Sequence, residues 1–222
     1  MNAASPREVV ISRLWSQLQL VRADDRALIA LDGFDGVGKT HLAQELVELG
    51  AARGGRPLTR VSIDGFHRPK AERLRAGSGP EGFYRGSYRY DAFWECVIKP
   101  LRRGETVTPA VWDVARDHPV TPGEVVVPPR GILIVDGIFL QRSELIDAWD
   151  ATVGVDAPFT VTVPRGNARF PGPHDRDPEA SSNRRYVGGQ RLYVSEAAPK
   201  ERATWIFDNT HLDRPTFRRV AG

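Results

Sequence analysis

The sequence predicts an α/β fold with a doubly wound parallel sheet, and three features carry that prediction. Two apolar runs, residues 27–31 and 131–139, are typical of parallel strands buried on both faces. The first run leads into a glycine-rich turn, and an amphipathic helical segment at 41–47 follows the turn. A buried strand, a glycine turn and a helix in this order form the opening unit of a sheet covered by helices.

Length and composition bound the class of protein. The 222 residues suffice for one domain with a small lid, so we expect residues 1–222 to form a single domain. The net charge is +3, the arginines are scattered, and the single cysteine, Cys96, has no internal disulfide partner. No membrane-length apolar stretch or signal-peptide core occurs. We expect a cytoplasmic protein without nucleic-acid or membrane partners, and homo-oligomerisation stays open.

Residues 33–40 match G-x-x-x-x-G-K-[ST] at every fixed position. In such a loop the glycines turn backbone N–H groups inward, and the next helix adds its positive dipole end, which together favour phosphate. Lys39 is expected to reach the β and γ phosphates, and the Thr40 hydroxyl to ligate Mg²⁺. We therefore predict ATP and Mg²⁺ as cofactors, with nucleotide-binding residues Gly33, Asp35, Gly36, Val37, Gly38, Lys39 and Thr40.

A second strand, predicted at 58–63, ends in Asp64-Gly65-Phe66-His67. Carboxylates at such strand ends lie where doubly wound sheets bind ligands. A phosphate loop followed by this motif resembles the uridine kinase, phosphoribulokinase and pantothenate kinase group of P-loop small-molecule kinases. The resemblance implies that Asp64 orients or deprotonates an acceptor hydroxyl and that His67 belongs to the acceptor site. The alternative is that Asp64 caps a turn.

We interpret residues 65–120 as an acceptor-binding insertion. Within it, 68–90 is rich in Gly, Arg, Ser and Tyr and is predicted to be a long ordered loop, with Tyr88 and Arg89 lining the acceptor pocket. Asp91 is expected to cap a helix that runs to about residue 101. The segment ending in Trp112-Asp113 resembles the family segment whose aromatic side chain stacks on the base, although a core-edge tryptophan is the alternative.

Three departures from the family pattern concern the acceptor. Arg89 replaces the aspartate expected to hold ribose hydroxyls, Val114 replaces an aromatic, and Asp117 occupies the histidine position. Asp91 or Asp113 is then the candidate to hold a sugar. An arginine at position 89 would suit an acceptor that already carries negative charge.

The run at 131–139 resembles the family's Glu-Gly strand, with Asp136 in place of the glutamate. This resemblance places Asp136 near Thr40, to hold Mg²⁺ directly or through water. Elsewhere the patterns predict a helix at about 6–21 with Ser5 and Pro6 at its start, a short helix capped by Ser143, and a strand at 151–155.

Residues 159–163 are β-branched, which favours a strand, but the family has a helix there and we follow the resemblance. It places Arg165 and Arg169 on one helical face and a lid at about 165–190, with the mobile part near 171–178. Arg169 and Arg176 are catalytic candidates, and Arg165 and Arg185 acceptor-site candidates; the alternative is a solvated basic surface. A helix at 183–194, interrupted at Gly188-Gly189, and a final strand at 204–210 complete the chain.

The resemblance covers about residues 27–210. It implies transfer of the γ-phosphoryl group of ATP to the 5′ hydroxyl of a uridine- or cytidine-like nucleoside. A kinase for another polyol, a sugar-like or an acidic alcohol is the first alternative, because of Arg89, Val114 and Asp117. A non-catalytic nucleotide-binding regulator is the second, although the Asn-Lys-x-Asp string of guanine-binding switches does not occur.

Overall fold

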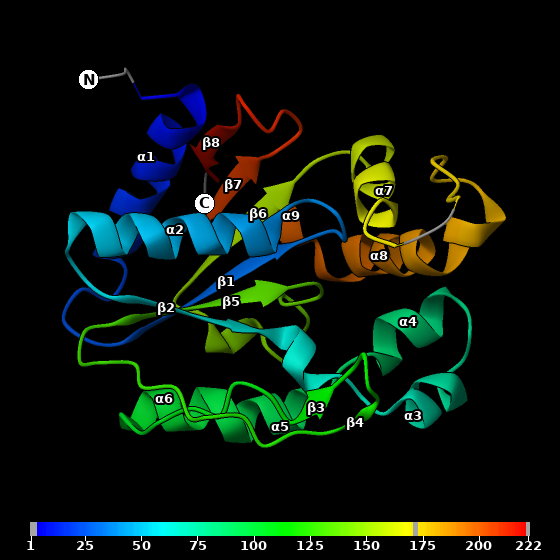
Figure 1. Ribbon diagram of the computed structural model, residues 1–222, viewed down its shortest axis with the longest axis horizontal. Helices are drawn as coiled ribbons and strands as arrows, with labels where there is room; N and C mark the ends of the chain where they lie inside the picture. Colours follow the sequence, from blue (N-terminus) through cyan, green and yellow to red (C-terminus); the bar gives the residue numbers. More distant parts are fainter. Residues whose placement is uncertain (1–3, 171–172, 221–222) are drawn as a thin grey trace.

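A six-stranded sheet in the order β2-β5-β1-β6-β7-β8 forms the centre of the computed structural model, which describes residues 4–170 and 173–220 (Figure 1). Five strands are parallel, as the sequence predicts: β1 (Ala27–Gly33), β2 (Leu58–Ser62), β5 (Ile132–Gly137), β6 (Ala151–Asp156) and β7 (Trp205–Asp208). The last strand, β8 (Thr216–Arg219), pairs antiparallel with β7 and was not predicted.

Helices cover both faces of this sheet (Figure 1). On one face lie α1 (Pro6–Leu20) and α2 (Lys39–Arg53), and on the other α4 (Pro80–Gly86), α5 (Tyr90–Phe93), the π-helical segment η2 (Trp94–Ile98), α6 (Lys99–Arg103) and α8 (Arg184–Ala197). Neighbouring residues of β1 enter different cores: Ile29 packs with α1 and α2, whereas Leu28 and Ala30 join the opposite cluster. Burial on both sides explains why the strand is apolar without alternation.

The start of α1 agrees with its sequence signature. The Ser5 hydroxyl accepts a hydrogen bond from the Glu8 backbone, and the Glu8 carboxylate accepts one from the Ser5 N–H at 2.7 Å, with Pro6 in the first turn. The side chains Ile11, Leu14 and Leu18 then face the core.

The prediction of a long loop at 68–90 is wrong, because this segment contains two short helices, α3 (Lys70–Arg75) and α4. Gly77 and Gly79 do separate α3 from α4, whereas other glycines serve close packing. A Cβ on Gly82 would lie 2.2 Å from the Gly77 carbonyl oxygen, and one on Gly189 would lie 2.6 Å from the Phe83 ring. Gly188 and Gly189 therefore let α8 approach α4, and α8 continues through them without the expected interruption.

Two predicted helix caps are also wrong. The helix near residue 91 begins at Tyr90, with Arg89 at the cap position, so Asp91 lies in the first turn and is exposed. The Ser143 hydroxyl donates to the neighbouring Glu144 carboxylate, and only a single 3₁₀ turn, η3 (Ile146–Ala148), forms downstream. At Ser143 the short side chain thus satisfies a local partner other than a helical N–H.

The helix expected from the resemblance at 159–169 is confirmed as α7 (Phe159–Asn167). It ends two residues before Arg169, so Arg165 and Arg169 do not share one helical face. Pro171 and Gly172 of the expected lid lie outside the described residues. The remaining elements are η1 (Ile63–Phe66), the hairpin of β3 (Trp112–Asp113) and β4 (His118–Pro119), η4 (Ser181–Asn183) and α9 (Pro199–Arg202). Among the described residues, no helix has the length and apolar character needed to span a bilayer.

Candidate active site

The turn between β1 and α2 has the geometry of a phosphate loop. Gly36 and Gly38 adopt φ values of +74° and +96°, in the left-handed region that favours glycine. A Cβ on Gly33 would lie 2.2 Å from the Val155 carbonyl oxygen, and one on Gly36 would lie 2.2 Å from that of Thr162. Side chains at these positions are therefore excluded by β6 and α7.

Lys39, the first residue of α2, lies folded into this loop. Only 8% of the residue is exposed, and its Nζ donates to the Phe34 carbonyl at 2.8 Å. Burial lowers the pKa of the Lys39 ammonium, and the nearby carboxylates of Asp35, Asp32 and Asp64 oppose that shift. An ammonium held by one carbonyl, at the centre of a turn of N–H groups, is suited to exchange that contact for phosphate oxygens.

Asp136, the acid near the end of β5, contacts Thr40 directly. The Thr40 hydroxyl donates to Asp136 Oδ2 at 2.7 Å. Arg60 of β2 also pairs with this carboxylate, through Nε to Oδ1 at 2.8 Å and Nη2 to Oδ2 at 3.1 Å. A hydroxyl and a carboxylate are oxygen ligands of the kind Mg²⁺ prefers, directly or through water, so the residues fit the predicted cation.

Asp64 follows β2, the strand beside β5, and its side chain is 63% exposed. The Tyr88 hydroxyl donates to its Oδ1 at 2.9 Å, and His67 Nδ1 lies 2.8 Å from its carbonyl oxygen. Burial lowers the pKa of His67 and raises the pKa of Tyr88 far above its usual value. Among the described residues no backbone N–H donates to the Asp64 carboxylate, which disfavours the turn-cap alternative.

Of the other predicted acceptor residues, Trp112 and Asp113 form strand β3 of the short hairpin. Asp113 accepts from the backbone N–H groups of Ala115 and Arg116 in the β3–β4 turn, and Trp112 Nε1 donates to Asp117 at 3.3 Å. Asp117 in turn accepts from the Lys70 N–H at 2.7 Å, which attaches the hairpin to α3. The structure thus gives Trp112 and Asp113 local partners. It does not bring Asp91 into this set.

The arginines of the expected lid have different surroundings. Arg165 donates to the carbonyls of Asn209 and Thr210 at 2.9 and 2.8 Å, and Arg185 donates to the Gly77 carbonyl at 3.0 Å. Arg169 is exposed. Desolvation raises the pKa of the Asp35 carboxyl above its usual value, and the positive charges of Lys39 and Arg169 oppose that shift. Arg176 is exposed beyond α7. Arg169 therefore acts on a carboxyl of the phosphate loop, and Arg165 contacts Asn209, whose amide donates to the loop at Val37.

Three further side chains support the site, and two of them, Gln190 and Arg60, were missed at the sequence level. Gln190 of α8 accepts from the Asp35 N–H at 2.8 Å, and the Asn209 amide donates to the Val37 carbonyl at 2.7 Å. Arg60 is the third. Gln190 and Asn209 are buried polar side chains far along the chain from the loop. Gln190 lies in no sequence motif, so only its tertiary contact identifies it, whereas Asn209 lies in the segment 204–210, where the resemblance places a turn near the nucleotide base.

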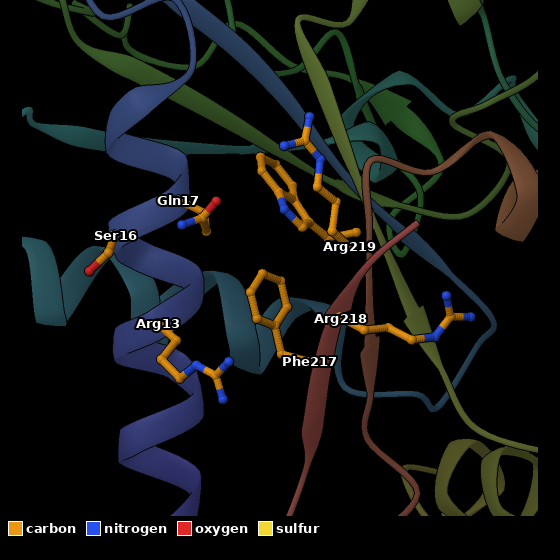
Figure 2. Close-up of a pocket in the computed structure, with 7 residues that line it drawn as sticks. Arg13, Ser16, Gln17, Phe217, Arg218 and Arg219 are labelled. Atoms are coloured by element: carbon orange, nitrogen blue, oxygen red, sulfur yellow. The ribbon is translucent and has the colours of Figure 1, made fainter. Parts of the chain in front are cut away.

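A cavity of about 360 Å³ lies away from this site, between α1 and β8 (Figure 2). It is lined by Arg13, Ser16, Gln17, Trp205, Phe217, Arg218 and Arg219. Arg219 pairs with Trp205, the first residue of β7, so the cavity lies at the amino-terminal end of the parallel strands. The phosphate loop, Asp64 and Asp136 lie at the opposite, carboxyl-terminal end.

Comparison with solved structures finds the same arrangement of strands and helices in kinases. A possible uridine kinase from Bacillus stearothermophilus superposes with a TM-score of 0.73 at 19% identity, covering 90% of this chain and 98% of that one. The chain has the fold of the uridine kinase-like P-loop kinases. A putative fructose transport system kinase from Silicibacter sp. TM1040 matches with a TM-score of 0.65 at 21% identity, over 87% and 95% of the two chains.

A third match is D-glycerate 3-kinase from Cryptococcus neoformans var. grubii, with a TM-score of 0.58, 12% identity and coverage of 93% and 96%. No protein-family model matches the sequence, and comparison with curated proteins finds no significant relative. At these identities the resemblance establishes the fold, and function has to be argued from the site.

Proposed function

We propose that this protein is a kinase that transfers the γ-phosphoryl group of ATP to a hydroxyl of a small molecule. The observation that carries the proposal is that Thr40, Asp136 and Asp64 all lie at the carboxyl-terminal end of the parallel strands. Thr40 lies in α2 after β1, Asp136 lies in β5 and Asp64 follows β2; these three strands are adjacent in the sheet, and Thr40 contacts Asp136 at 2.7 Å. Phosphoryl transfer requires a positioned triphosphate, a compensating cation and an aligned nucleophile, and these residues supply each requirement.

The residues take distinct roles in this proposal. Lys39 and the loop N–H groups hold the triphosphate, and Thr40 with Asp136 holds Mg²⁺, which compensates negative charge when bound. Asp64 accepts a hydrogen bond from the acceptor hydroxyl and aligns it, while Tyr88 fixes the carboxylate from the other side. Arg169 adds positive charge near Asp35, with Arg176 as the second lid candidate. Residues 65–120 bind the acceptor and 165–190 form the lid of one domain.

For the acceptor, we propose a uridine- or cytidine-like nucleoside that is phosphorylated at its 5′ hydroxyl. The fold match to a possible uridine kinase and the position of Trp112 support this choice. A sugar-like or acidic alcohol is the second candidate. It is supported by Arg89 at the position of the ribose-binding aspartate, and by fold matches to a putative fructose transport system kinase and to a glycerate kinase.

The experiment is an acceptor screen that measures ADP release from ATP·Mg²⁺. Nucleosides, simple sugars, polyols and hydroxy acids are added one at a time, and the phosphorylated product is identified by mass spectrometry. A kinase responds to one acceptor class, whereas a nucleotide-binding regulator shows the same slow ATP turnover throughout. The class that responds decides between the two candidates for the acceptor.

Lys39→Ala provides the negative control for the screen. Removal of the ammonium leaves the γ-phosphoryl charge without its principal side-chain contact, so we expect activity to fall by roughly 10²-fold or more. The thermal midpoint should stay close to that of the wild type, because Lys39 is desolvated and, among the described residues, its ammonium donates a hydrogen bond only to the Phe34 carbonyl. Lys99→Ala is the matched control, since this exposed lysine pairs with Glu95 on the surface. Full activity in Lys39→Ala would refute its assigned role.

A further inference from the structure

We infer that Arg60 is a positioning residue of the cation site. Its guanidinium pairs with the Asp136 carboxylate, so that a divalent cation binds at this carboxylate only together with a bound polyphosphate. The identity of that polyphosphate rests on the proposed function, whereas the contact of Arg60 with Asp136 does not. The Cα of Arg60 pairs in register with that of Ile134, two residues before Asp136, and its side chain extends along the strands to the end of β5.

The hydrogen bonds at Asp136 leave little capacity for a metal. Oδ2 accepts from both the Thr40 hydroxyl, at 2.7 Å, and Arg60 Nη2, at 3.1 Å, while Oδ1 accepts from Arg60 Nε at 2.8 Å. A carboxylate oxygen with two donors has both lone-pair directions in use. The oxygen that faces Thr40 is therefore saturated, and a cation cannot bind it directly until one of the donors leaves.

The ion pair between Arg60 and Asp136 also disfavours the binding of a free cation. The Asp136 side chain is 2% exposed, and a carboxylate buried to this degree needs a cation partner, which Arg60 supplies. A free divalent cation approaching the pair meets a carboxylate that is already neutralised, with Lys39 close enough to act on the same group. The attraction that an unpaired aspartate would exert is thus removed.

The chain also offers few further ligands. In the described residues, no group of three or more His, Cys, Asp and Glu side chains is arranged to hold a metal. Mg²⁺ requires about six oxygens and is commonly bound through one or two protein groups plus substrate phosphates. Because Thr40 directs its O–H toward Asp136, the lone pairs of its oxygen stay free for a cation. Phosphate oxygens must supply much of the remaining coordination.

The test uses Mn²⁺ as the probe and electron paramagnetic resonance to count bound ions, with the full chain free of nucleotide. Wild type should show no saturable Mn²⁺ site unless a non-hydrolysable ATP analogue is added. Arg60→Met should gain one saturable Mn²⁺ site without nucleotide, because the Asp136 carboxylate loses the guanidinium that pairs with it. Arg60→Lys, which keeps the charge, should stay close to wild type.

Two further variants make the result specific. Arg60→Met combined with Asp136→Asn should lose the gained site, because Asp136 is the ligand that becomes free. Arg218→Met removes an exposed arginine from strand β8, far from the site, and should bind Mn²⁺ as wild type does. Should Arg60→Met fold poorly, Arg60→Gln keeps an N–H donor without the charge, and the double variant leaves no unpaired buried carboxylate.

Saturable Mn²⁺ binding by nucleotide-free wild type would overturn the inference, as would the lack of a saturable Mn²⁺ site in the folded Arg60→Met or Arg60→Gln variant. The measurement without nucleotide is independent of kinase activity. If the ATP analogue induces no Mn²⁺ site in wild type, the proposed function fails, and the variants alone still decide the role of Arg60.

Discussion

Asp64 shows how a single carboxylate is prepared by its neighbours. Its Oδ1 accepts from Tyr88 at 2.9 Å, and the rest of the side chain stays accessible. The tyrosine is 2% exposed, and burial holds its pKa so high that it remains a hydrogen-bond donor. A fixed donor on one oxygen orients the carboxylate and leaves the other oxygen for an incoming hydroxyl.

Asp64→Asn should therefore reduce turnover far more than nucleotide affinity. A neutral amide can still contact the acceptor but cannot accept its proton, so we expect kcat to fall by about 10²- to 10⁴-fold. Tyr88→Phe removes only the orienting donor and should cost less. Product formation gives kcat, and titration with a nucleotide analogue gives the affinity. Equal losses of turnover and affinity would instead identify Asp64 as a nucleotide ligand.

His67 should make stability depend on pH. Burial lowers its pKa in the folded state below the value of about 6.5 in the unfolded chain, the Asp64 carbonyl opposing the shift. Between these two pKa values the unfolded chain binds a proton that the folded protein does not, so the free energy of unfolding falls as the pH falls through that window.

Urea unfolding of wild type and His67→Asn at about pH 7.5 and about pH 5 checks this expectation. Asparagine can still donate to the Asp64 carbonyl but cannot titrate. The stability of wild type relative to the variant should be smaller at the lower pH. A difference that does not change with pH would contradict the assigned shift.

At the scale of elements, the phosphate loop is shaped by what packs behind it. Gly36 has φ +74°, and a Cβ there would lie 2.2 Å from the Thr162 carbonyl oxygen and 2.6 Å from the Gly166 nitrogen, both in α7. Phe34 adds a stacked contact to Phe159, with ring centroids 4.4 Å apart. The loop and α7 therefore fit as one unit, and displacing either should disturb the other.

Gly36→Ala tests this fit, with Gly54→Ala as the matched control. Gly54 has nearly the same φ, +75°, but a Cβ added there would meet no atom within 4 Å. The control should lose only the backbone cost of about 1–2 kcal/mol. Gly36→Ala should lose a further 1–3 kcal/mol or so from forced displacement of α7, together with nucleotide affinity. Urea unfolding measures the stability of both variants, and equal losses would contradict the proposed clash.

At the scale of the whole molecule, Arg56 joins chain segments that are distant in sequence. This arginine is 9% exposed, and burial lowers its pKa. Its guanidinium has no carboxylate partner among the ion pairs of the described residues. Instead it donates to the backbone carbonyls of Gln19, Val21, Arg22, Asp25 and Arg130, at 2.6–3.2 Å. These carbonyls belong to the end of α1 and to the segments that enter β1 and β5.

Arg56→Met should destabilise the fold by roughly 2–4 kcal/mol, because the lost donors leave several enclosed carbonyls without partners. Arg53→Met is the control, since Arg53 is exposed in α2 and lies over the Trp15 ring at 5.9 Å. The control should change stability by less than about 1 kcal/mol. Thermal or urea unfolding distinguishes them. Similar stabilities for the two variants would show that the carbonyls find water as a substitute.

Much of the fold could be predicted because its elements are encoded locally. The doubly buried strands β1 and β5 are apolar runs, Ser5 and Glu8 form a capping box, and the glycine loop lies between a strand and a helix. The wrong predictions concern residues whose role depends on tertiary packing rather than on their neighbours in the sequence. Gly189 was interpreted as a break, yet it permits close contact between α8 and Phe83 of α4, which folding brings together.

By itself the sequence determined the phosphate loop, the parallel strands that lead to Asp64 and Asp136, and the helix at α7 through resemblance. Only the tertiary structure decided which groups complete the site. Arg60 reaches Asp136, Gln190 reaches Asp35 and Tyr88 reaches Asp64 across 76, 155 and 24 residues of chain. Periodicity and motif spacing report on neighbours along the chain, whereas a hydrogen bond between distant segments depends on where the sheet and its helices place them.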